Sequence, residues 1–167
     1  MPTKVVNSGI RLSLLIVTLA IASVTNDTAQ AQKIPSLMLF GDVSIGNGFS
    51  PDPLTVRGMS GGNVTGKQIA GRSETPTGPC VGFFDEKPDH TLVLTSKFGY
   101  LSLVVKSPDD ATLIVIGPGG TWCNDDLQGK NPGIVGEWLP GTYKIWVGSY
   151  KKERYFPYSL EITKAKW

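Results

Sequence analysis

The sequence predicts an all-β domain, an antiparallel β-sandwich of jelly-roll type with about eight strands. Three observations support this prediction. Glycine and proline, with 20 and 12 residues, punctuate the chain, and such residues mark turns between short elements. Several of the runs between them alternate apolar and polar residues with the period of two of a strand that has one wet face. No segment beyond residue 31 shows the apolar periodicity of a long helix.

The N-terminal residues have the features of an export signal. Lys4 and Arg11 precede an apolar run over residues 12–24, and Ala29 and Ala31 supply the small residues that a signal peptidase reads. The apolar run has 13 residues, fewer than the roughly 20 that span a bilayer. We therefore predict a signal peptide over residues 1–31, cleaved after Ala31, and a periplasmic or extracellular mature protein without a transmembrane segment. An N-terminal membrane anchor is the alternative.

Cleavage at this position leaves one domain of 136 residues, which is long enough to bury a core. Within it, residues 32–79 predict a loop-rich N-terminal segment with edge strands, and residues 80–167 predict the sandwich core. The mature chain carries 14 basic and 13 acidic side chains. This balance argues against a protein that binds nucleic acid through its charge.

Three runs show the alternation most clearly. The apolar residues that share a face in each run are, in chain order, Leu101, Leu103 and Val105; Tyr143, Ile145 and Val147; and Tyr158, Leu160 and Ile162. Residues 112–116 are apolar on both faces, which indicates a central strand. Residues 91–96 and 100–106 are predicted to pair as a hairpin. Weaker strand candidates lie at residues 37–43, 54–57, 81–84 and 134–138.

Two cysteines, Cys80 and Cys123, remain after cleavage. In an exported chain they are most simply explained by one disulfide. Two cysteines and one histidine without C-x-x-C spacing do not form a zinc site.

Ser60 and His90 are the two residues considered for catalysis. Ser60 lies in a glycine-rich segment that superficially resembles the nucleophile segment of trypsin-like proteases, but His90 follows it, whereas those enzymes place the base first. His90 follows Asp89 at the start of a predicted strand, a placement that is more typical of a turn. The sequence thus predicts no catalytic set.

Clustered oxygen ligands are the stronger site candidates. Asp109 and Asp110 precede the strand at residues 112–116, and Asn124, Asp125 and Asp126 follow it. A straight strand of this length would separate the two clusters by about 17 Å. Side chains of these types suit Ca²⁺, which takes six to eight oxygen ligands. Calcium is therefore the predicted cofactor, and Asx turns with solvated carboxylates are the alternative.

Aromatic side chains supply the candidate binding surface. Alternation directs Trp146 and Lys144 outward from a strand whose other face is core, and Trp122, Trp138 and Tyr150 lie near strand ends. Exposed planar rings stack on sugars or anchor a protein partner. Coverage of these rings by another sheet, a loop or the N-terminal segment is the alternative.

A set of blocks resembles the bacterial pre-peptidase C-terminal domain. The blocks are Asp110-Ala111-Thr112-Leu113, Gly117-Pro118-Gly119-Gly120, Asn124-Asp125-Asp126 and Pro140-Gly141-Thr142-Tyr143. Their neighbours, Trp122-Cys123-Asn124-Asp125-Asp126 and Trp146-Val147-Gly148-Ser149-Tyr150, resemble stand-alone exported cyanobacterial proteins. The resemblance covers residues 80–163 and implies a non-catalytic jelly-roll-like sandwich that in some members binds calcium or assists polymer binding. The chain departs from the usual setting because it has no protease domain.

The sequence therefore predicts a non-enzymatic exported β-sandwich module, calcium-stabilised, that contacts an envelope or extracellular polymer or protein. Two alternatives remain open. One is a small secreted hydrolase that uses Ser60 or His90, and the other is a self-assembling structural envelope protein.

Overall fold

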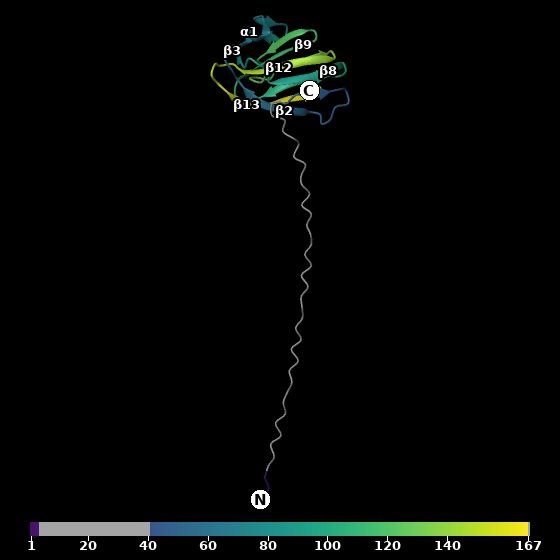
Figure 1. The fold of residues 1–167 in the computed structure, drawn as a ribbon, viewed down its shortest axis with the longest axis vertical. Coiled ribbons are helices and arrows are strands. Elements are labelled where there is room, and N and C mark those ends of the chain that lie inside the picture. Colours follow the sequence, from purple (N-terminus) through teal and green to yellow (C-terminus); the bar gives the residue numbers. More distant parts are fainter. Residues whose placement is uncertain (4–40, 167) are drawn as a thin grey trace. The chain divides into compact units, whose positions relative to one another are not determined.

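Short strands build the described part of the chain, residues 1–3 and 41–166 of this computed structural model (Figure 1). The strands are β1 (Val43–Ile45), β2 (Leu54–Ser60), β3 (Val64–Thr65), β4 (Glu74–Thr75), β5 (Gly78–Pro79), β6 (Phe83–Phe84), β7 (His90–Leu94), β8 (Phe98–Lys106), β9 (Ala111–Gly117), β10 (Gly120–Asn124), β11 (Gly133–Trp138), β12 (Gly141–Ser149) and β13 (Phe156–Thr163). The helix α1 (Gly66–Ala70) has five residues. Eight of the strands, β2 and β7 to β13, have at least five residues.

Two sheets form the sandwich, and the all-β prediction is confirmed. The smaller sheet has the antiparallel order β11-β8-β13-β2. In the larger sheet β12 pairs with β7 on one side and β9 on the other, β1 extends the sheet beyond β7, and β10 extends it beyond β9. The β1–β7 pair is parallel, and β6 and β3 join at the end of β12. Strands β10 and β11 are therefore edge strands of different sheets.

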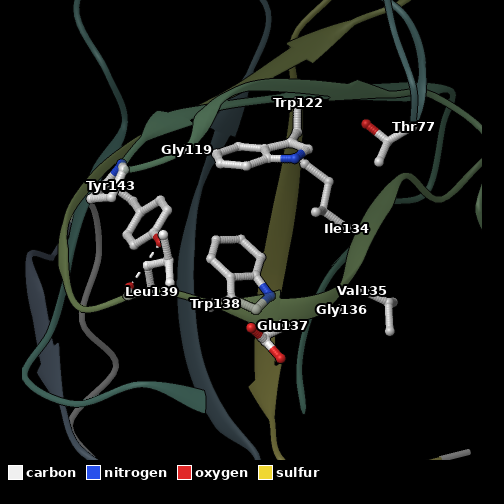
Figure 2. Close-up of a pocket in the computed structure, with 11 residues that line it drawn as sticks. Thr77, Gly119, Trp122, Ile134, Val135, Gly136, Glu137, Trp138, Leu139 and Tyr143 are labelled. Atoms are coloured by element: carbon white, nitrogen blue, oxygen red, sulfur yellow. Dashed lines mark hydrogen bonds between the residues drawn. The ribbon is translucent and has the colours of Figure 1, made fainter. Parts of the chain in front are cut away.

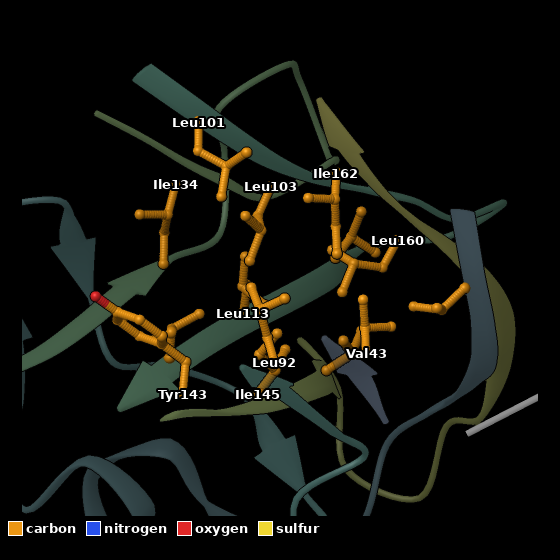
Figure 3. Packing of buried hydrophobic residues seen from close by; sticks show 14 of the residues in the cluster. Val43, Leu92, Leu101, Leu103, Leu113, Ile134, Tyr143, Ile145, Leu160 and Ile162 are labelled. Carbon is orange, nitrogen blue, oxygen red and sulfur yellow. The ribbon is translucent and has the colours of Figure 1, made fainter. Parts of the chain in front are cut away.

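The alternating runs bury the faces that the sequence predicts. Leu101, Leu103 and Val105 project from the smaller sheet, together with Leu160 and Ile162, and meet residues of β7, β9 and β12 from the larger sheet (Figure 3). The predicted inward residues of β12 are Tyr143, Ile145 and Val147, and all three lie in this core. Burying each such side chain contributes about 1.5–3 kcal/mol. The central position predicted for residues 112–116 is also confirmed, because β9 lies between β10 and β12.

The predicted hairpin between residues 91–96 and 100–106 is wrong. Strand β7 belongs to the larger sheet and β8 to the smaller one, so the link between Leu94 and Phe98 crosses from one layer to the other. Phe98, expected in a turn, is 2% exposed and packs in the core. The burial of this ring accounts for the crossing, because an in-plane turn would leave it in water.

The segment between residues 41 and 79 covers the outer face of the larger sheet and forms the far edge of the smaller one. Strand β2 pairs with β13 as that edge. Helix α1 contacts β9 and β10 and contributes Ala70 to a second apolar cluster, with Phe84, Ile114 and the two cysteines. The larger sheet is therefore packed on both faces.

The predicted disulfide is present between Cys80 and Cys123, which are 43 residues apart in sequence. It ties the segment before β6 to edge strand β10, and both cysteines are buried in the second cluster. The predicted signal peptide and most of the strand candidate at residues 37–43 lie outside the described residues. No helix in the described part of the chain combines the length and apolar character needed to cross a membrane.

Candidate functional site

A cleft opens where the edge strands β10 and β11 diverge. One end is closed, because Gly133 donates its N–H to Oδ1 of Asn124 at 2.9 Å. The cavity beyond this tie has a volume of about 150 Å³ and a largely apolar lining (Figure 2). Its lining residues are Thr77, Pro118, Gly119, Trp122, Ile134, Val135, Gly136, Glu137, Trp138, Leu139 and Tyr143.

Three aromatic rings form the wall of the cleft. The ring centroids of Trp122 and Trp138 are 6.1 Å apart, and those of Trp138 and Tyr143 are 5.0 Å apart in an edge-to-face arrangement. Figure 2 shows the three rings turned toward one another, one each from β10, β11 and β12. Edge-to-face pairs contribute about 0.5–1.5 kcal/mol beyond their burial, so this wall is a fixed surface.

Hydrogen bonds hold two of these rings in place. Trp138 donates its Nε1–H to the carbonyl of Leu101 at 3.0 Å, and Tyr143 donates its hydroxyl to the carbonyl of Leu139 at 2.8 Å. Burial raises the pKa of the Tyr143 hydroxyl, which keeps it protonated as a donor. Trp122 is half-buried and packs against the same core, so it is the ring of the three that offers most surface to a ligand.

Two glycines leave room for these rings. A Cβ at Gly117 would lie 2.3 Å from Cδ1 of Tyr143, so the ring packs directly on the glycine backbone. Gly119, at the turn between β9 and β10, has φ of +96° and approaches the Trp122 ring. Such a backbone conformation favours glycine. The cleft therefore depends on the absence of side chains at both positions.

The cleft is electrically neutral. Among its lining residues Glu137 is the charged one, and its carboxylate pairs with Nζ of Lys97 at 2.8 Å. Both side chains are more than half exposed, and such pairs contribute little to stability. The pair nonetheless balances the charge at the rim.

Of the predicted binding residues, Trp122 lines the cleft and the others lie elsewhere. Trp146 is half-buried against the second cluster on the outer face of the larger sheet. Lys144 donates to the hydroxyl of Thr91 at 2.9 Å on an exposed surface, and Tyr150 is 47% exposed in the loop after β12. The structure does not bring these three together with Trp122 in one site.

Sequence reasoning missed Trp138 and Tyr143 as members of the site. Tyr143 was assigned correctly to the core, and Trp138 was noted near the end of a predicted strand at residues 134–138. The available signal was the clustering of large aromatic residues at strand ends on both sides of residue 130. That clustering does not reveal the packing of the two sheets, which brings β10 and β11 together.

The two acidic clusters lie at the same end of the sheet, and the expected separation by a straight strand is wrong. Strand β10 returns antiparallel to β9 and pairs Asn124 with Leu113. Burial raises the pKa of Asp110, and the charge of Asp126 raises it further. Burial likewise raises the pKa of Asp125, with the charges of Asp126 and Asp110 adding to the effect.

Asn124 and Asp109, two of the predicted calcium ligands, are engaged in structural bonds. Asn124 bridges two segments, since it also donates its side-chain N–H to the carbonyl of Thr77 at 2.8 Å. Asp109 accepts the backbone N–H of Asp110 at 2.8 Å, which lowers its pKa. Across residues 41–166, no group of three or more His, Cys, Asp or Glu side chains is arranged to hold a metal ion.

Ser60 and His90 both serve as structural hydrogen-bonding groups. Oγ of Ser60 accepts the N–H of Phe156 at 3.3 Å, and the side chain is 1% exposed. His90 lies between the carbonyl of Gly41 and the hydroxyl of Tyr158, at 3.1 and 2.7 Å. No hydrogen bond within the described residues joins Ser60 to His90.

Among the carboxyl groups of the described residues, Asp89 has the pKa that is displaced furthest from its ordinary value. Its Oδ2 accepts the N–H of Val147 at 2.8 Å. Burial raises its pKa to about 7, and the charge of Asp85 adds to this effect. Asp89 lines a wide, open depression with Asp42, Asp85 and Glu86, and its contact with β12 makes it a strand-anchoring group.

No family model matches the chain. An uncharacterized protein of Synechococcus elongatus is 30% identical to it over 100 residues, which make up 58% of this chain and 74% of that protein. Among solved structures, the pre-peptidase C-terminal domain of a Bacillus anthracis collagenase matches with a TM-score of 0.45 and 14% identity. That match covers 73% of this chain and 94% of the collagenase domain. Both likenesses named from the sequence, to pre-peptidase C-terminal domains and to a cyanobacterial protein, are thus found.

Proposed function

The chain belongs to the family of the uncharacterized Synechococcus elongatus protein, and we propose that it is an exported, non-enzymatic β-sandwich module that binds an envelope or extracellular polymer or protein. The observation that carries the proposal is the aromatic cleft between β10 and β11. Concave, mostly apolar sites with a few polar groups are the usual form of a binding site. Its wall is rigid, which lowers the entropic cost of ordering on binding.

The placement of Ser60 and His90 supports binding rather than hydrolysis. A serine nucleophile needs a base within hydrogen-bonding reach, and each of the two residues is instead committed to a separate structural bond. Burial also lowers the pKa of His90. The hydrolase alternative predicts turnover that Ser60→Ala or His90→Ala abolishes, and a screen of esterase, peptidase and glycosidase substrates measures it.

The disulfide supports the exported location. Disulfides persist in oxidising compartments and are rare in the cytosol, and both cysteines of the chain are paired. We propose accordingly that residues 1–31 are a cleaved signal peptide and that residues 32–79 and 80–167 form one domain. We also propose that the sandwich is of the jelly-roll type. The repeated passage of the chain from one sheet to the other supports this assignment.

A co-sedimentation assay with the insoluble envelope fraction of the native host tests the proposal. The mature chain should bind, and Trp122→Ala should weaken binding about tenfold or more, the usual effect of removing an aromatic anchor. Trp146→Ala is the matched control, because Trp146 lies on the outer face of the larger sheet. Absence of binding by the wild-type chain, or equal binding by both variants, would contradict the cleft as the site.

Two further roles are separated by simple measurements. Self-assembly as an envelope protein predicts association at high concentration, which light scattering detects. Calcium stabilisation is the second candidate property, and the observation that favours it is the closeness of Asp126 to both Asp110 and Asp125. Burial raises the pKa of each of these two carboxyls, and the charge of Asp126 raises it further. The proposed ligands are the carboxylates of Asp125 and Asp126, and main-chain carbonyls and water would complete the coordination. Asn124 and Asp109 are otherwise engaged, and no three acidic side chains of the described residues are arranged to hold an ion.

A further inference from the structure

We propose that the cleft receives an extended, uncharged peptide segment, which pairs with edge strand β11 at Val135 and places one large apolar side chain against Trp122. This inference rests on the proposed binding function and narrows the ligand from polymer or protein to a peptide main chain. The argument uses the backbone of β11, the polar groups of the cleft, its charge and its size.

The backbone of β11 presents a free donor and acceptor at Val135. Val105 donates its N–H to the carbonyl of Pro132 at 2.9 Å, so residue 132 faces β8. The N–H of Gly133 points away from β8 and donates to the side chain of Asn124 on β10. Because the hydrogen-bonding direction alternates along a strand, residue 134 faces β8 and the N–H and C=O of Val135 face the cleft. Edge groups of this kind are a template for another strand.

The polar side chains of the cleft are already engaged. Trp138 and Tyr143 donate to main-chain carbonyls, and the hydroxyl of Thr77 donates to the carbonyl of Cys123 at 2.8 Å. A sugar ring needs several free side-chain groups for its hydroxyls, and the lining leaves few. The groups that remain free are the main-chain N–H and C=O of β11 at Val135. In β-strand addition, such groups pair with the main chain of a peptide.

One side-chain donor remains for the ligand. Within the described residues the Nε1–H of Trp122 has no hydrogen-bond partner, and its neighbours are the rings of Trp138 and Tyr143. An indole N–H is a donor and cannot accept. A ligand carbonyl that lies beside the ring would satisfy it, in addition to the two bonds at Val135.

The charge and size of the cleft define the segment. The Lys97–Glu137 pair balances the charge at the rim, so the complementary occupant is uncharged where it enters. The cavity of about 150 Å³ equals an apolar cavity that holds benzene. One phenylalanine, leucine or methionine side chain is therefore the matching occupant.

Selection from a phage-displayed library of random 12-residue peptides on the immobilised mature protein tests the inference. The selected peptides should share one large apolar residue in an uncharged stretch. Added to labelled protein, a synthetic selected peptide should shift the NMR signals of the Val135 amide and the Trp122 indole N–H. Chitohexaose and cellohexaose, the two oligosaccharide probes, should shift neither.

Variants test the backbone contact. Val135→Pro removes the free N–H and leaves the bonds between β11 and β8 intact, because the N–H of Val135 faces away from β8, so peptide affinity should fall at least tenfold. Trp146→Ala, on the outer face of the larger sheet and away from the cleft, is the control and should bind within about twofold of wild type. Thermal unfolding confirms that each variant folds, and the NMR shifts of the wild-type protein test the contact even if the proline variant does not.

The outcomes distinguish this inference from the proposed function. Peptides that bind without shifting Val135, or that bind Val135→Pro unchanged, overturn the strand-pairing inference and leave the binding function standing. Shifts at Trp122 with an oligosaccharide but not with peptides do the same and assign the cleft to a polysaccharide. Self-association that Val135→Pro abolishes assigns the edge to a second copy and overturns the inference. Failure of all probes, together with no envelope binding, overturns both.

Discussion

The hydroxyl of Tyr158 donates a hydrogen bond of 2.7 Å to Nε2 of His90 across the core, which joins β13 of one sheet to β7 of the other. The direction of this hydrogen bond follows from the contact of the other ring nitrogen of His90, Nδ1. Nδ1 lies 3.1 Å from the carbonyl oxygen of Gly41, and a carbonyl only accepts, so Nδ1 carries the proton and Nε2 accepts. The neutral imidazole is thus the bonded form.

Tyr158→Phe should lower the free energy of unfolding by about 1–3 kcal/mol, because it leaves Nε2 of His90 buried without a donor. Urea unfolding at pH 8 measures the change. Tyr155→Phe is the control, since Tyr155 is 50% exposed, and it should alter stability by less than about 0.5 kcal/mol. Equal stability of Tyr158→Phe and wild type would show that the bond is replaced by water.

Asp89→Asn should become increasingly more stable than wild type as the pH rises from about 4 to 7. The carboxyl pKa is 3.8 in an unfolded chain and about 7 in the fold. In that window the native protein holds a proton that the unfolded chain has released, so wild-type stability falls as pH rises. The amide oxygen of asparagine can still accept the N–H of Val147. We expect a gain of about 1 kcal/mol or more at pH 7.5.

Urea unfolding at intervals between pH 4.5 and 8 measures this difference. His90 acts with the opposite sign, because burial lowers its pKa from 6.5 and the unfolded chain takes up the proton first as pH falls. Both proteins share His90, so its effect cancels in the comparison. Glu74→Gln, at an exposed carboxylate, should run parallel to wild type. A difference between Asp89→Asn and wild type that is independent of pH would refute the assignment.

Replacement of both cysteines, Cys80→Ala with Cys123→Ala, should lower the free energy of unfolding by about 4 kcal/mol according to loop-closure entropy for a separation of 43 residues. Both cysteines are buried, so alanine keeps the site apolar. Guanidinium unfolding of the variant and of the oxidised wild type gives the difference. Wild type unfolded with a reductant present should match the variant, and a variant as stable as the oxidised protein would contradict the prediction.

Gly117→Ala should destabilise the protein by about 1–3 kcal/mol, the usual cost of overpacking, because the new methyl group meets the ring of Tyr143. Displacement of that ring should also weaken binding at the cleft. Gly99→Ala is the matched control in a strand, since a Cβ there meets no atom within 4 Å. A variant at Gly117 with unchanged melting temperature and unchanged binding would show that the ring is mobile.

Calcium at ten times its dissociation constant should stabilise the protein by about 1.4 kcal/mol, which corresponds to a rise of a few degrees in melting temperature. The double replacement Asp125→Ala with Asp126→Ala should abolish the rise. Asp109→Ala should retain it, because Asp109 is engaged in its own turn. No shift up to millimolar calcium would refute calcium binding, and magnesium at the same concentration controls for charge screening.

The buried face of each strand could be predicted from sequence, because it depends only on the alternation of residues along that strand. Alternation at Tyr143, Ile145 and Val147 fixes which face meets the core, whichever strands lie alongside. The partner of each strand is not local. The short link before Phe98 is compatible with a hairpin and with a crossing between sheets, and the burial of one ring decides between them.

The candidate site was only partly predictable for the same reason. Trp122 was identified as an aromatic residue at a strand end, but its neighbours Trp138 and Tyr143 come from two other strands. The proximity of Asp110 to Asp126 likewise follows from the β9–β10 pairing, which a straight-strand estimate could not supply. Sites made by the ends of several strands require the topology before the residues can be grouped.

Strand β10 carries Trp122 on one face and Cys123 on the other. An edge strand normally exchanges its amide protons early, because little holds its outer side. Here the cross-link to Cys80 fixes one face of β10, and the hydroxyls of Thr75 and Thr77 contact the outward-facing backbone of Cys123. The surface that the cleft offers to a ligand is therefore expected to resist local unfolding until the whole domain unfolds, so that a protease would find no frayed strand end there.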